Sequence, residues 1–533
     1  MKKRVILIPI IAAAFAASGC SAYEPYEAEN ISAVSSLTQT AKTVNTSDMF
    51  TENDMKAEYD ESKGVKIDLS GDTAFCDSDS VRISGSTVTV TDEGTYILSG
   101  TLSDGMIIVS AEDTDKIRLV LDGVRISNSD SAAIYVSRAD KVFVTTACGS
   151  ENTLSNGGKY SAIDDNNIDA VIFSKDDLTF NGSGTLTVNA SAGHGIVSKD
   201  DLVLTGGTYC VTAAEQGLSG KDSIRIADGT YTIISGSDGI HSDNADDTEK
   251  GFVYIKDGSF SFTSKGDAVS AEEYLTVDGG EFFVATGNGS ASVTMPAEQF
   301  GFGMRGEFNS ESAAAESKVS CKGFKTDGVL NINGGSFTID TEDDSFHAGG
   351  SILVSGGIFN IRSGDDALHS DSDVIISGGD FVIEYCYEGI EGLGITIDNG
   401  TFDITACDDG INSAGGADSS GFGGRRDEFA AQADCLITVN GGTFVIVSDG
   451  DCLDSNGDLI INGGTLKLTC NGNGNTALDC NGKYTNNGGD VTTNDGSENN
   501  PGQMPGVPGD MGGMRDGEGM DGRGDMKPPP QYG

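Results

Sequence analysis

Carboxylate side chains recur at one position of a repeat that is about 22 residues long, as in the steps from Gly335 to Gly357 and from Gly357 to Gly379. Nine residues after this repeated glycine, with one long insertion left out of the count, stand Gln216, Asp238, Asp267, Lys322, Asp344, Asp366, Glu388, Asp409, Asp451 and Asn473. Seven of these ten residues are acidic, whereas only 82 of all 533 residues are. Composition alone therefore does not explain the column. Three repeats carry a second carboxylate directly before it: Asp343, Asp365 and Asp408.

A second polar column follows three residues later in each repeat. Its members are Ser219, His241, Ser270, Lys325, His347, His369, Glu391, Asn412, Asp454 and Thr476. Three of the four histidines of the chain lie in it. We expect these residues to form hydrogen bonds along the stack of repeats, or to contact a hydroxyl or carboxylate group of a sugar. A transition-metal site built from His347, His369 and neighbouring carboxylates is the alternative.

The spacing of the first column predicts bound cations. If the repeats stack as coils about 4.8 Å apart, two like charges repel by about 1 kcal/mol in water and about 3–4 kcal/mol at an effective dielectric constant of 20. Three contacts of this kind between Asp344 and Asp409 amount to roughly 3–10 kcal/mol, which is comparable with the net stability of a whole domain. Hard cations with oxygen ligands would compensate this charge, and calcium suits an exported protein better than magnesium. The alternative is a splayed, solvated acidic face without a bound ion.

Short strands with one buried face would position these columns. Residues five and three before the repeated glycine, and two and four after it, are mostly apolar, as in Leu330–Ile339, Ile352–Ile361 and Val374–Ile383. Alternation at a period of two is typical of β-strands, and a further apolar position eleven residues after the glycine marks a third strand. No segment of this core has a period of 3.6, and 75 glycines would be costly in helices. The pattern predicts an all-β fold, a right-handed parallel β-helix with three short strands per coil.

Three repeats are longer than the others. The excess is 7 residues just after His241, 33 residues just before Lys322 and 20 residues just after Asn412. We expect all three to emerge at one edge of the stack, where loops often form a binding surface.

The two long insertions, Asn288–Cys321 and Ser413–Ala433, contain candidate contacts to a ligand. Phe302 could cover the face of a sugar ring, and Arg425 could pair with a carboxylate. The alternatives are that Phe302 holds its own loop on the stack and that Arg425 is solvated.

Composition and the chain ends set the domain organisation. A net charge of −49 argues against binding to nucleic acid or to anionic lipid surfaces. Residues 1–20 combine a basic start, an apolar run and small residues before Cys20, which predicts a lipoprotein-type signal peptide with Cys20 as the lipidated residue. An ordinary signal peptide is the alternative. We expect residues 21–64 to form a flexible spacer, 65–493 the β-helix, and 494–533 a disordered tail rich in Gly, Pro and Met.

Four segments of the repeat resemble one known family. They are Asp343-Asp-Ser-Phe-His347, Gly364-Asp-Asp-Ala-Leu-His-Ser370, Tyr387-Glu-Gly-Ile-Glu391 and Cys407-Asp-Asp-Gly-Ile-Asn-Ser-Ala-Gly-Gly416. In this order they are similar to clostridial-type carbohydrate-binding β-helix proteins, and the likeness extends over about residues 65–490. The resemblance implies a pectate-lyase-like β-helix, exported to the cell surface, that binds calcium and acidic plant polysaccharide such as polygalacturonate. The acidic turn positions of the family correspond here to metal ligands at Asp343, Asp344, Asp365, Asp366, Glu388, Glu391, Asp408 and Asp409.

These observations lead to three hypotheses of function. The first is a binding module, anchored to the cell membrane through Cys20, that holds acidic polysaccharide through calcium, with His347, His369 and Asn412 beside the ligand. The second is a polysaccharide lyase, which needs a base beside the metal, and Lys322 or Lys325 would serve. The third is a structural stalk or adhesin that binds no glycan. The sequence does not indicate the oligomeric state.

Overall fold

The structure, a computed structural model, describes residues 46–161, 163–295, 319–414, 432, 434–472 and 474–502. Within these ranges the helical elements are η1 (Thr46–Asp48), α1 (Glu52–Met55), η2 (Ser290–Ser292) and η3 (Ser497–Asn499), and the other regular elements are strands. No described helix is long and apolar enough to cross a membrane. The predicted all-β class is confirmed.

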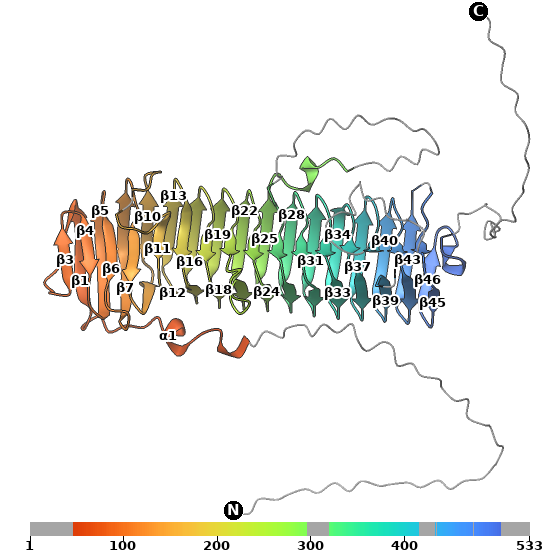
Figure 1. The fold of residues 1–533 in the computed structure, drawn as a ribbon, viewed down its shortest axis with the longest axis horizontal. Helices are drawn as coiled ribbons and strands as arrows, with labels where there is room; N and C mark the ends of the chain where they lie inside the picture. The colour runs from red at the N-terminus through yellow and green to blue at the C-terminus, as the bar shows by residue number, and fades with distance from the viewer. Residues whose placement is uncertain are drawn as a thin grey trace, which may run out of the picture. The chain divides into compact units, whose positions relative to one another are not determined.

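Each coil contributes three strands, called here the first, second and third strand (Figure 1). First strands are β9 (Lys141–Thr146), β12 (Asp177–Gly182), β15 (Asp201–Leu204), β18 (Ser223–Ile226), β21 (Phe252–Ile255), β24 (Tyr274–Val277), β27 (Val329–Ile332), β30 (Ile352–Val354), β33 (Asp373–Ile376), β36 (Gly394–Ile397), β39 (Leu436–Val439), β42 (Asp458–Ile461) and β45 (Tyr484–Asn486). Second strands are β10 (Glu151–Asn156), β13 (Thr185–Ala190), β16 (Thr208–Ala213), β19 (Thr230–Ser235), β22 (Ser259–Ser264), β25 (Glu281–Thr286), β28 (Ser336–Thr341), β31 (Ile358–Ser363), β34 (Asp380–Cys386), β37 (Thr401–Ala406), β40 (Thr443–Ser448), β43 (Thr465–Cys470) and β46 (Asp490–Thr493).

The third strands form a separate sheet. They are β6 (Met106–Ser110), β8 (Ile134–Arg138), β11 (Ala170–Ser174), β14 (His194–Ser198), β17 (Leu218–Gly220), β20 (Ile240–Ser242), β23 (Val269–Ala271), β26 (Phe324–Thr326), β29 (Phe346–Ala348), β32 (Leu368–Ser370), β35 (Ile390–Glu391), β38 (Ile411–Ser413), β41 (Leu453–Ser455) and β44 (Leu478–Cys480). The first coils add β1 (Val65–Gly71), β2 (Thr73–Phe75), β3 (Val81–Ser84), β4 (Thr87–Val90), β5 (Gly94–Leu102) and β7 (Lys116–Asn128). Antiparallel pairs among the described strands are confined to β1–β2 and β3–β4.

The register follows the repeat found in the sequence. Parallel pairing places Leu330, Ile352 and Val374 in line on three successive first strands, at steps of 22 residues. The second and third strands pair with the same step. The prediction of stacked parallel coils with three strands each is confirmed.

Stacked aromatic rings fill the core beside the repeated glycines. They are Tyr209, Tyr231, Phe260, Phe282, Phe337, Phe359, Phe381, Phe402 and Phe444, and neighbouring ring centroids are 4.3–5.1 Å apart. The glycine two residues before each ring is required at this place. Gly357, for example, has φ +128°, and a Cβ atom there would lie 2.9 Å from the ring of Phe359.

The three longer repeats leave the stack at two different turns, not at one edge. The 33-residue excess lies between β25 and β26, before a third strand, and η2 begins it (Figure 1). The other two follow the third strands β20 and β38. These third strands are only three residues long. The spacing of apolar residues in the sequence therefore did not show at which end of a third strand an insertion lies.

The start of the described chain packs along the outer face of the first strands, although the sequence predicted a flexible spacer as far as residue 64. Asp54 of α1 is buried, lies 2.8 Å from Nζ of Lys141 and accepts a hydrogen bond of 2.8 Å from Thr179. The ring of Phe50 contacts Tyr254, with centroids 5.9 Å apart. We call residues 46–60 the strap; Figure 1 shows α1 alongside the stack.

The last coil is covered by residues that the sequence assigned to the disordered tail. The carboxylate of Asp495 accepts a hydrogen bond of 2.7 Å from the backbone N–H of Ala477. Ser497, at the start of η3, accepts one of 3.0 Å from Leu478. These contacts satisfy N–H groups that the open end of the stack would otherwise expose.

The aromatic stack gives a test of the core. Phe359 is 1% exposed, and its ring lies 5.0 Å from Phe337 and 4.3 Å from Phe381. We expect Phe359→Ala to lower the free energy of unfolding by about 3–5 kcal/mol, because it leaves a cavity between two rings. The neighbouring Ile358 is 59% exposed, and Ile358→Ala is the matched control, with an expected change within about 0.5 kcal/mol. Urea denaturation followed by circular dichroism measures both, and equal losses would contradict the assignment.

Candidate functional site

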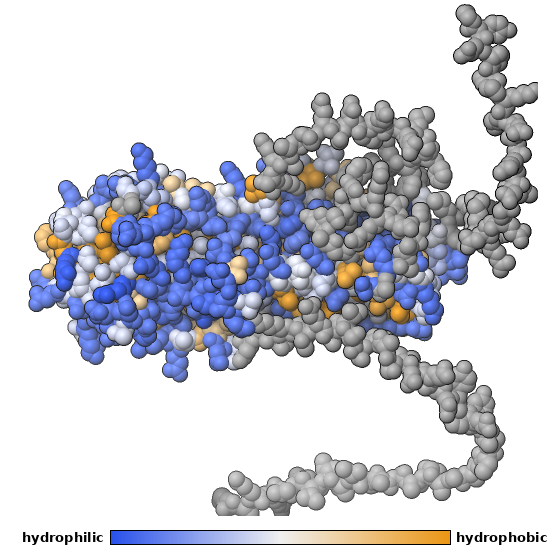
Figure 2. All heavy atoms as spheres, in the orientation of Figure 1, coloured by the Kyte–Doolittle hydropathy of each residue, from blue (hydrophilic) through white to orange (hydrophobic). Residues whose placement is uncertain are grey.

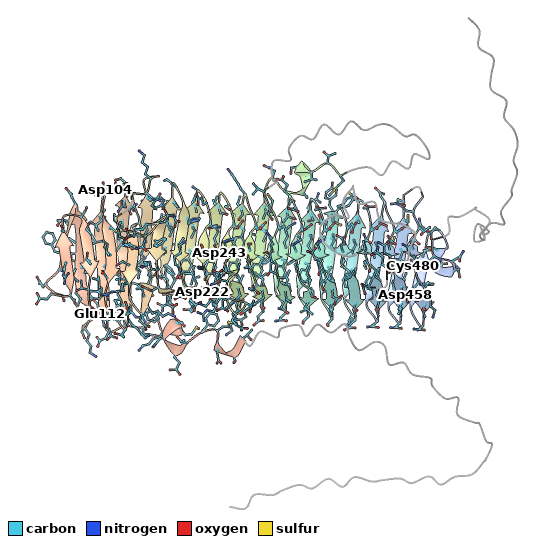
Figure 3. The ribbon with its side chains drawn as sticks, viewed as in Figure 1. Asp104, Glu112, Asp222, Asp243, Asp458 and Cys480 are labelled. Atoms are coloured by element: carbon cyan, nitrogen blue, oxygen red, sulfur yellow. The ribbon has the colours of Figure 1, made fainter. Side chains whose placement is uncertain are left out.

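The first polar column lies in the turns between second and third strands. We call the following residues the ladder: Asp238, Asp267, Lys322, Asp344, Asp366, Glu388, Asp409 and Asp451. Each stands two residues before a third-strand residue that pairs with its counterpart in the next coil. Figure 3 labels Asp104 in an earlier turn of this kind, whereas Glu112 and Asp222 lie in turns that follow third strands.

The last coil departs from the predicted columns. Leu453 pairs with Leu478, a step of 25 residues instead of 22. Thr476 therefore follows Asp451 in the ladder, where the sequence predicted Asn473. Asp479, not Thr476, pairs with Asp454 in the second column.

At five of the seven steps of the ladder, a side-chain carboxylate of one coil accepts a hydrogen bond from the backbone of the next coil. The N–H of Asp366 donates to Oδ1 of Asp344 at 3.1 Å, and the N–H of Glu388 donates to Oδ1 of Asp366 at 3.0 Å. The same bond joins Asp238 to Asp267, Asp267 to Lys322, and Asp409 to Asp451. Sequence reasoning missed this role. The available signal was the preference for Asp, since six of the seven acidic ladder residues are Asp, whose short side chain reaches the adjacent backbone.

The central ladder carboxylates are buried, whereas Asp238, Asp409 and Asp451 are partly exposed; the alternative of a splayed, solvated acidic face therefore does not describe the centre of the ladder. Asp344, Asp366 and Glu388 are 2%, 4% and 3% exposed. Burying a charge is costly unless it is paired and hydrogen-bonded. The groups that pair with these carboxylates therefore decide which charges of the ladder remain uncompensated.

Residues of the second column form hydrogen bonds to ladder carboxylates, the two histidines within their own coil and Asn412 to the preceding coil. Nδ1 of His347 lies 2.9 Å from Oδ2 of Asp344, and Nδ1 of His369 lies 3.0 Å from Oδ2 of Asp366. The two imidazole rings are stacked, with centroids 5.0 Å apart. Asn412 donates to both oxygens of Glu388, at 3.1 and 3.0 Å.

His369 carries a positive charge within the site. Its Nδ1 also lies 2.6 Å from Oε2 of Glu391. Burial lowers the pKa of His369, but the bonds to Asp366 and Glu391 outweigh burial and raise this pKa to about 12. His369 therefore compensates part of the charge of two neighbouring carboxylates.

Lys322 compensates charge at the upstream end of the acidic coils. Its Nζ lies 2.9 Å from Oδ1 of Asp343 and 2.6 Å from Oδ2 of Asp344. Burial would lower the pKa of Lys322, but the charges of Asp344 and Asp343 raise it above its ordinary value. Burial would likewise raise the pKa of Asp344, but Lys322 and His347 hold it below its ordinary value. Lys325 follows Lys322 by three residues and belongs to the second column, where its backbone pairs with that of His347 in the next coil.

Negative charge downstream of Asp344 is not fully compensated by the described residues. Burial and neighbouring carboxylates raise the pKa values of Asp366, Glu388 and Asp409 well above their ordinary values. In addition, Oδ1 of Asn412 is buried and has no hydrogen-bond donor among the described residues. A buried amide oxygen beside crowded carboxylates is the donor set that a hard cation uses.

Three overlapping groups of the described residues bring potential ligand atoms within 4.8 Å of one another. They are Asp343, Asp344 and Asp365; Asp344, Asp366 and His369; and Asp366, Glu388 and Glu391. Six of the eight predicted metal ligands thus converge. Asp408 and Asp409 belong to no such group in the described ranges, but Asp451, Asp454 and Asp479 form a further group downstream. Phe302, Arg425 and Cys20 lie outside the described residues.

Comparisons with known proteins cover most of the stack. A family model described as "Carbohydrate-binding domain-containing protein" matches residues 84–367 and 365–501. A protein of the same description from Acetivibrio thermocellus is 42% identical over 226 residues, which are 42% of this chain and 79% of the relative. The chain is also similar to a solved structure described as "Structure of the polysaccharide lyase-like protein from C. thermocellum, Gadolinium derivative". The sequence identity is 33% and the TM-score is 0.44, over 50% of this chain and 96% of that chain.

Lys322 provides a test of charge compensation. Lys322→Met removes the cation between Asp343 and Asp344 and leaves Asp344 buried with His347 and the backbone N–H of Asp366 as its partners. We expect the free energy of unfolding in EGTA to fall by about 3 kcal/mol, as measured by urea denaturation. The matched control is Lys325→Met, because Lys325 is partly exposed and forms no ion pair among the described residues; a change below about 1 kcal/mol is expected. Similar losses in both variants would contradict the role of Lys322.

Proposed function

Because the chain belongs to the family of carbohydrate-binding domain-containing proteins, we propose that it binds an acidic polysaccharide through calcium ions held on the ladder. Polygalacturonate-like polymers are the proposed ligands. The family membership supports binding to carbohydrate. The calcium ions and the acidic character of the ligand go beyond the family membership and are our proposal.

The convergence of buried carboxylates in adjacent coils carries this proposal. Asp366, Glu388 and Glu391 bring ligand oxygens within 4.8 Å of one another, and all three are buried. At that separation two full charges repel by about 3–4 kcal/mol at an effective dielectric constant of 20. A divalent cation between them turns this repulsion into attraction.

The donor set fits calcium better than a transition metal. The group of Asp366, Glu388 and Glu391 offers only oxygen atoms, and the buried Oδ1 of Asn412 is a further oxygen on the side chain that binds Glu388. Calcium takes six to eight oxygen ligands. Nδ1 of His369 is already held between Asp366 and Glu391, and Nε2 lies 3.4 Å from Oδ1 of Asp371, so a metal ion would have to displace a carboxylate from either nitrogen.

Calcium also resolves the repulsion between the protein and an acidic ligand. The chain carries a net charge of −49, and a polyuronate carries one carboxylate on each sugar. A calcium ion that is not saturated by protein ligands has coordination positions for carboxylate or hydroxyl oxygens of the sugar. Several ions at the spacing of the coils would bind several sugars of one polymer. In this arrangement His347, His369 and Asn412 orient the carboxylates that hold the ions.

A lyase is the second candidate, and the surroundings of Lys322 weigh against it. A lyase needs a neutral base to remove the proton beside the uronate carboxyl group. Lys322 is held between Asp343 and Asp344, and these charges raise its pKa. We therefore propose binding without cleavage. Release of unsaturated, ultraviolet-absorbing product from polygalacturonate, lost on Lys322→Ala, would establish the lyase instead.

The handedness of the coils and the location of the protein are part of the same proposal. We propose a right-handed parallel β-helix, because crossovers between parallel strands of one sheet are right-handed in about 98% of cases. We further propose that the protein is exported and attached to the outer face of the cell membrane by a lipid on Cys20. The polymer would then be held at the cell surface.

Removal of calcium tests the proposed function. We expect the full chain to bind polygalacturonate at least about tenfold more tightly in calcium than in EGTA. Calcium at 100 times its Kd should also stabilise the protein by about 2.7 kcal/mol. Isothermal titration and thermal melting measure the two effects.

A pair of variants locates the effect on the ladder. Glu388→Gln keeps the shape of the side chain but removes a buried charge, and we expect at least about tenfold weaker calcium-dependent binding. Asp403→Asn is the control, because Asp403 is an exposed carboxylate on β37; its binding should change less than about twofold. Unchanged binding in EGTA, or equal effects of both variants, would refute the ladder as the site. No binding to any glycan would favour the stalk.

A further inference from the structure

A pocket of about 640 Å³ lies far along the stack from the ladder, between the strap and the outer surface of β5, β7 and β9. Figure 1 shows these strands at the orange end, with α1 nearby. Lys56, Lys116 and Arg118 line it together with three acidic residues. The positive and negative charges that line the pocket are therefore equal in number, although the chain as a whole has a net charge of −49. Figure 2 shows that much of the visible surface of the stack is hydrophilic.

Arg118 is the unusual group in this pocket. It stacks on Phe143, with Cζ 4.9 Å from the ring centroid. One of its nitrogens donates to Thr145 at 2.6 Å and to Asn181 at 3.3 Å, both neutral acceptors. Within the described part of the chain no carboxylate forms an ion pair with it. The same holds for Arg82 and Arg125, but these are exposed, whereas Arg138, Arg225 and Arg362 each have at least one acidic partner. Burial lowers the pKa of Arg118, with Glu58 opposing the shift.

A half-buried guanidinium group without an acidic partner can bind an anion. Its unused N–H groups form a planar fork that matches the two oxygens of a carboxylate. The neighbouring Lys116 already pairs with Asp140, so Arg118 and the exposed Lys56 of the strap are the lining cations open to a ligand, and of these Arg118 is the one fixed by the fold. Tyr59 of the strap, packed against Ile97 and Val120, adds an apolar wall, and the volume of the pocket lies within the usual range for sugar-sized ligands.

We propose that this pocket is a second glycan subsite, which binds the carboxylate of a uronic acid residue directly through Arg118 and does not need calcium. The choice of a uronate as ligand rests on the proposed function. The subsite differs from the ladder in its chemistry, because a fixed guanidinium group replaces a metal ion. A long polymer bound at the ladder could be held at this subsite as well, or a second chain end could occupy it.

Titration of the full chain with trigalacturonate in EGTA tests the subsite, because EGTA removes the calcium that the ladder needs. We expect binding in EGTA that Arg118→Gln weakens by about tenfold or more, since a charge-assisted fork is lost. Arg118→Lys should retain part of the affinity, because it keeps the charge without the fork. Arg125→Gln is the matched control on the same strand, where Arg125 is exposed, and its affinity should stay within about twofold. Cellotriose, which lacks carboxylates, should bind at least about tenfold more weakly than trigalacturonate.

The outcomes separate this proposal from the proposed function. If trigalacturonate does not bind in EGTA, or binds equally to wild type and Arg118→Gln, the subsite is refuted even when calcium-dependent binding of polygalacturonate persists. If inorganic phosphate displaces trigalacturonate at a lower concentration than galacturonate does, the pocket is a phosphate site and the proposal is overturned. If binding in EGTA depends on Arg118 while calcium and Glu388→Gln have no effect on polymer binding, the subsite stands and the ladder proposal fails. Melting curves in EGTA confirm that Arg118→Gln is folded.

Discussion

In-register stacking of coils is the constraint on which the other features depend. The backbone pairing of first, second and third strands fixes each coil about 4.8 Å from the next, so a residue type that recurs in the sequence becomes a continuous column. In the core this produces the ring stack that includes Phe337, Phe359 and Phe381. At the turns the same rule places Asp344, Asp366 and Glu388 against one another. The same stacking of coils therefore produces both the favourable packing of the rings and the unfavourable repulsion between the carboxylates.

The ladder is more than an acidic surface, because the two oxygens of a ladder carboxylate such as Asp366 bind different groups. Oδ1 of Asp366 accepts the N–H of Glu388 and so extends the backbone pairing through the turn. Oδ2 of the same residue contacts His369. A chain that replaced Asp344 and Asp366 by apolar residues would lose side-chain acceptors for the backbone N–H groups of the next coil. An amide could accept the same bond, so the backbone bond explains a short acceptor at this place and not its charge. The proposed cation would compensate the charge that Lys322 and His369 leave.

The sequence predicted those features that depend on the repeat and missed those that depend on single contacts. The alternation of apolar residues and the 22-residue step were sufficient to predict the pairing of Leu330 with Ile352, and the acidic column followed from the same count. The count failed in the last coil, where three additional residues place Thr476 and Asp479 in the columns. The strap could not be predicted, because its attachment depends on single contacts to residues far along the chain, such as Asp54 with Lys141 and Phe50 with Tyr254. The strap forms one wall of the pocket around Arg118, so the pocket could not be predicted from the sequence either.

Local charge, not net charge, decides where an anion can bind to this protein. At physiological ionic strength charges more than about 8 Å apart at the surface are largely screened, so a net charge of −49 does not by itself exclude an acidic polymer. Because each coil of a solenoid interacts mainly with its neighbours, the strain of the acidic coils is confined to the ladder region and the Arg118 pocket does not share it. Two anion sites of opposite design can therefore coexist on one stack. The proposed first site depends on ions between buried carboxylates, and the proposed second site depends on a guanidinium group that is half-buried and forms no ion pair among the described residues.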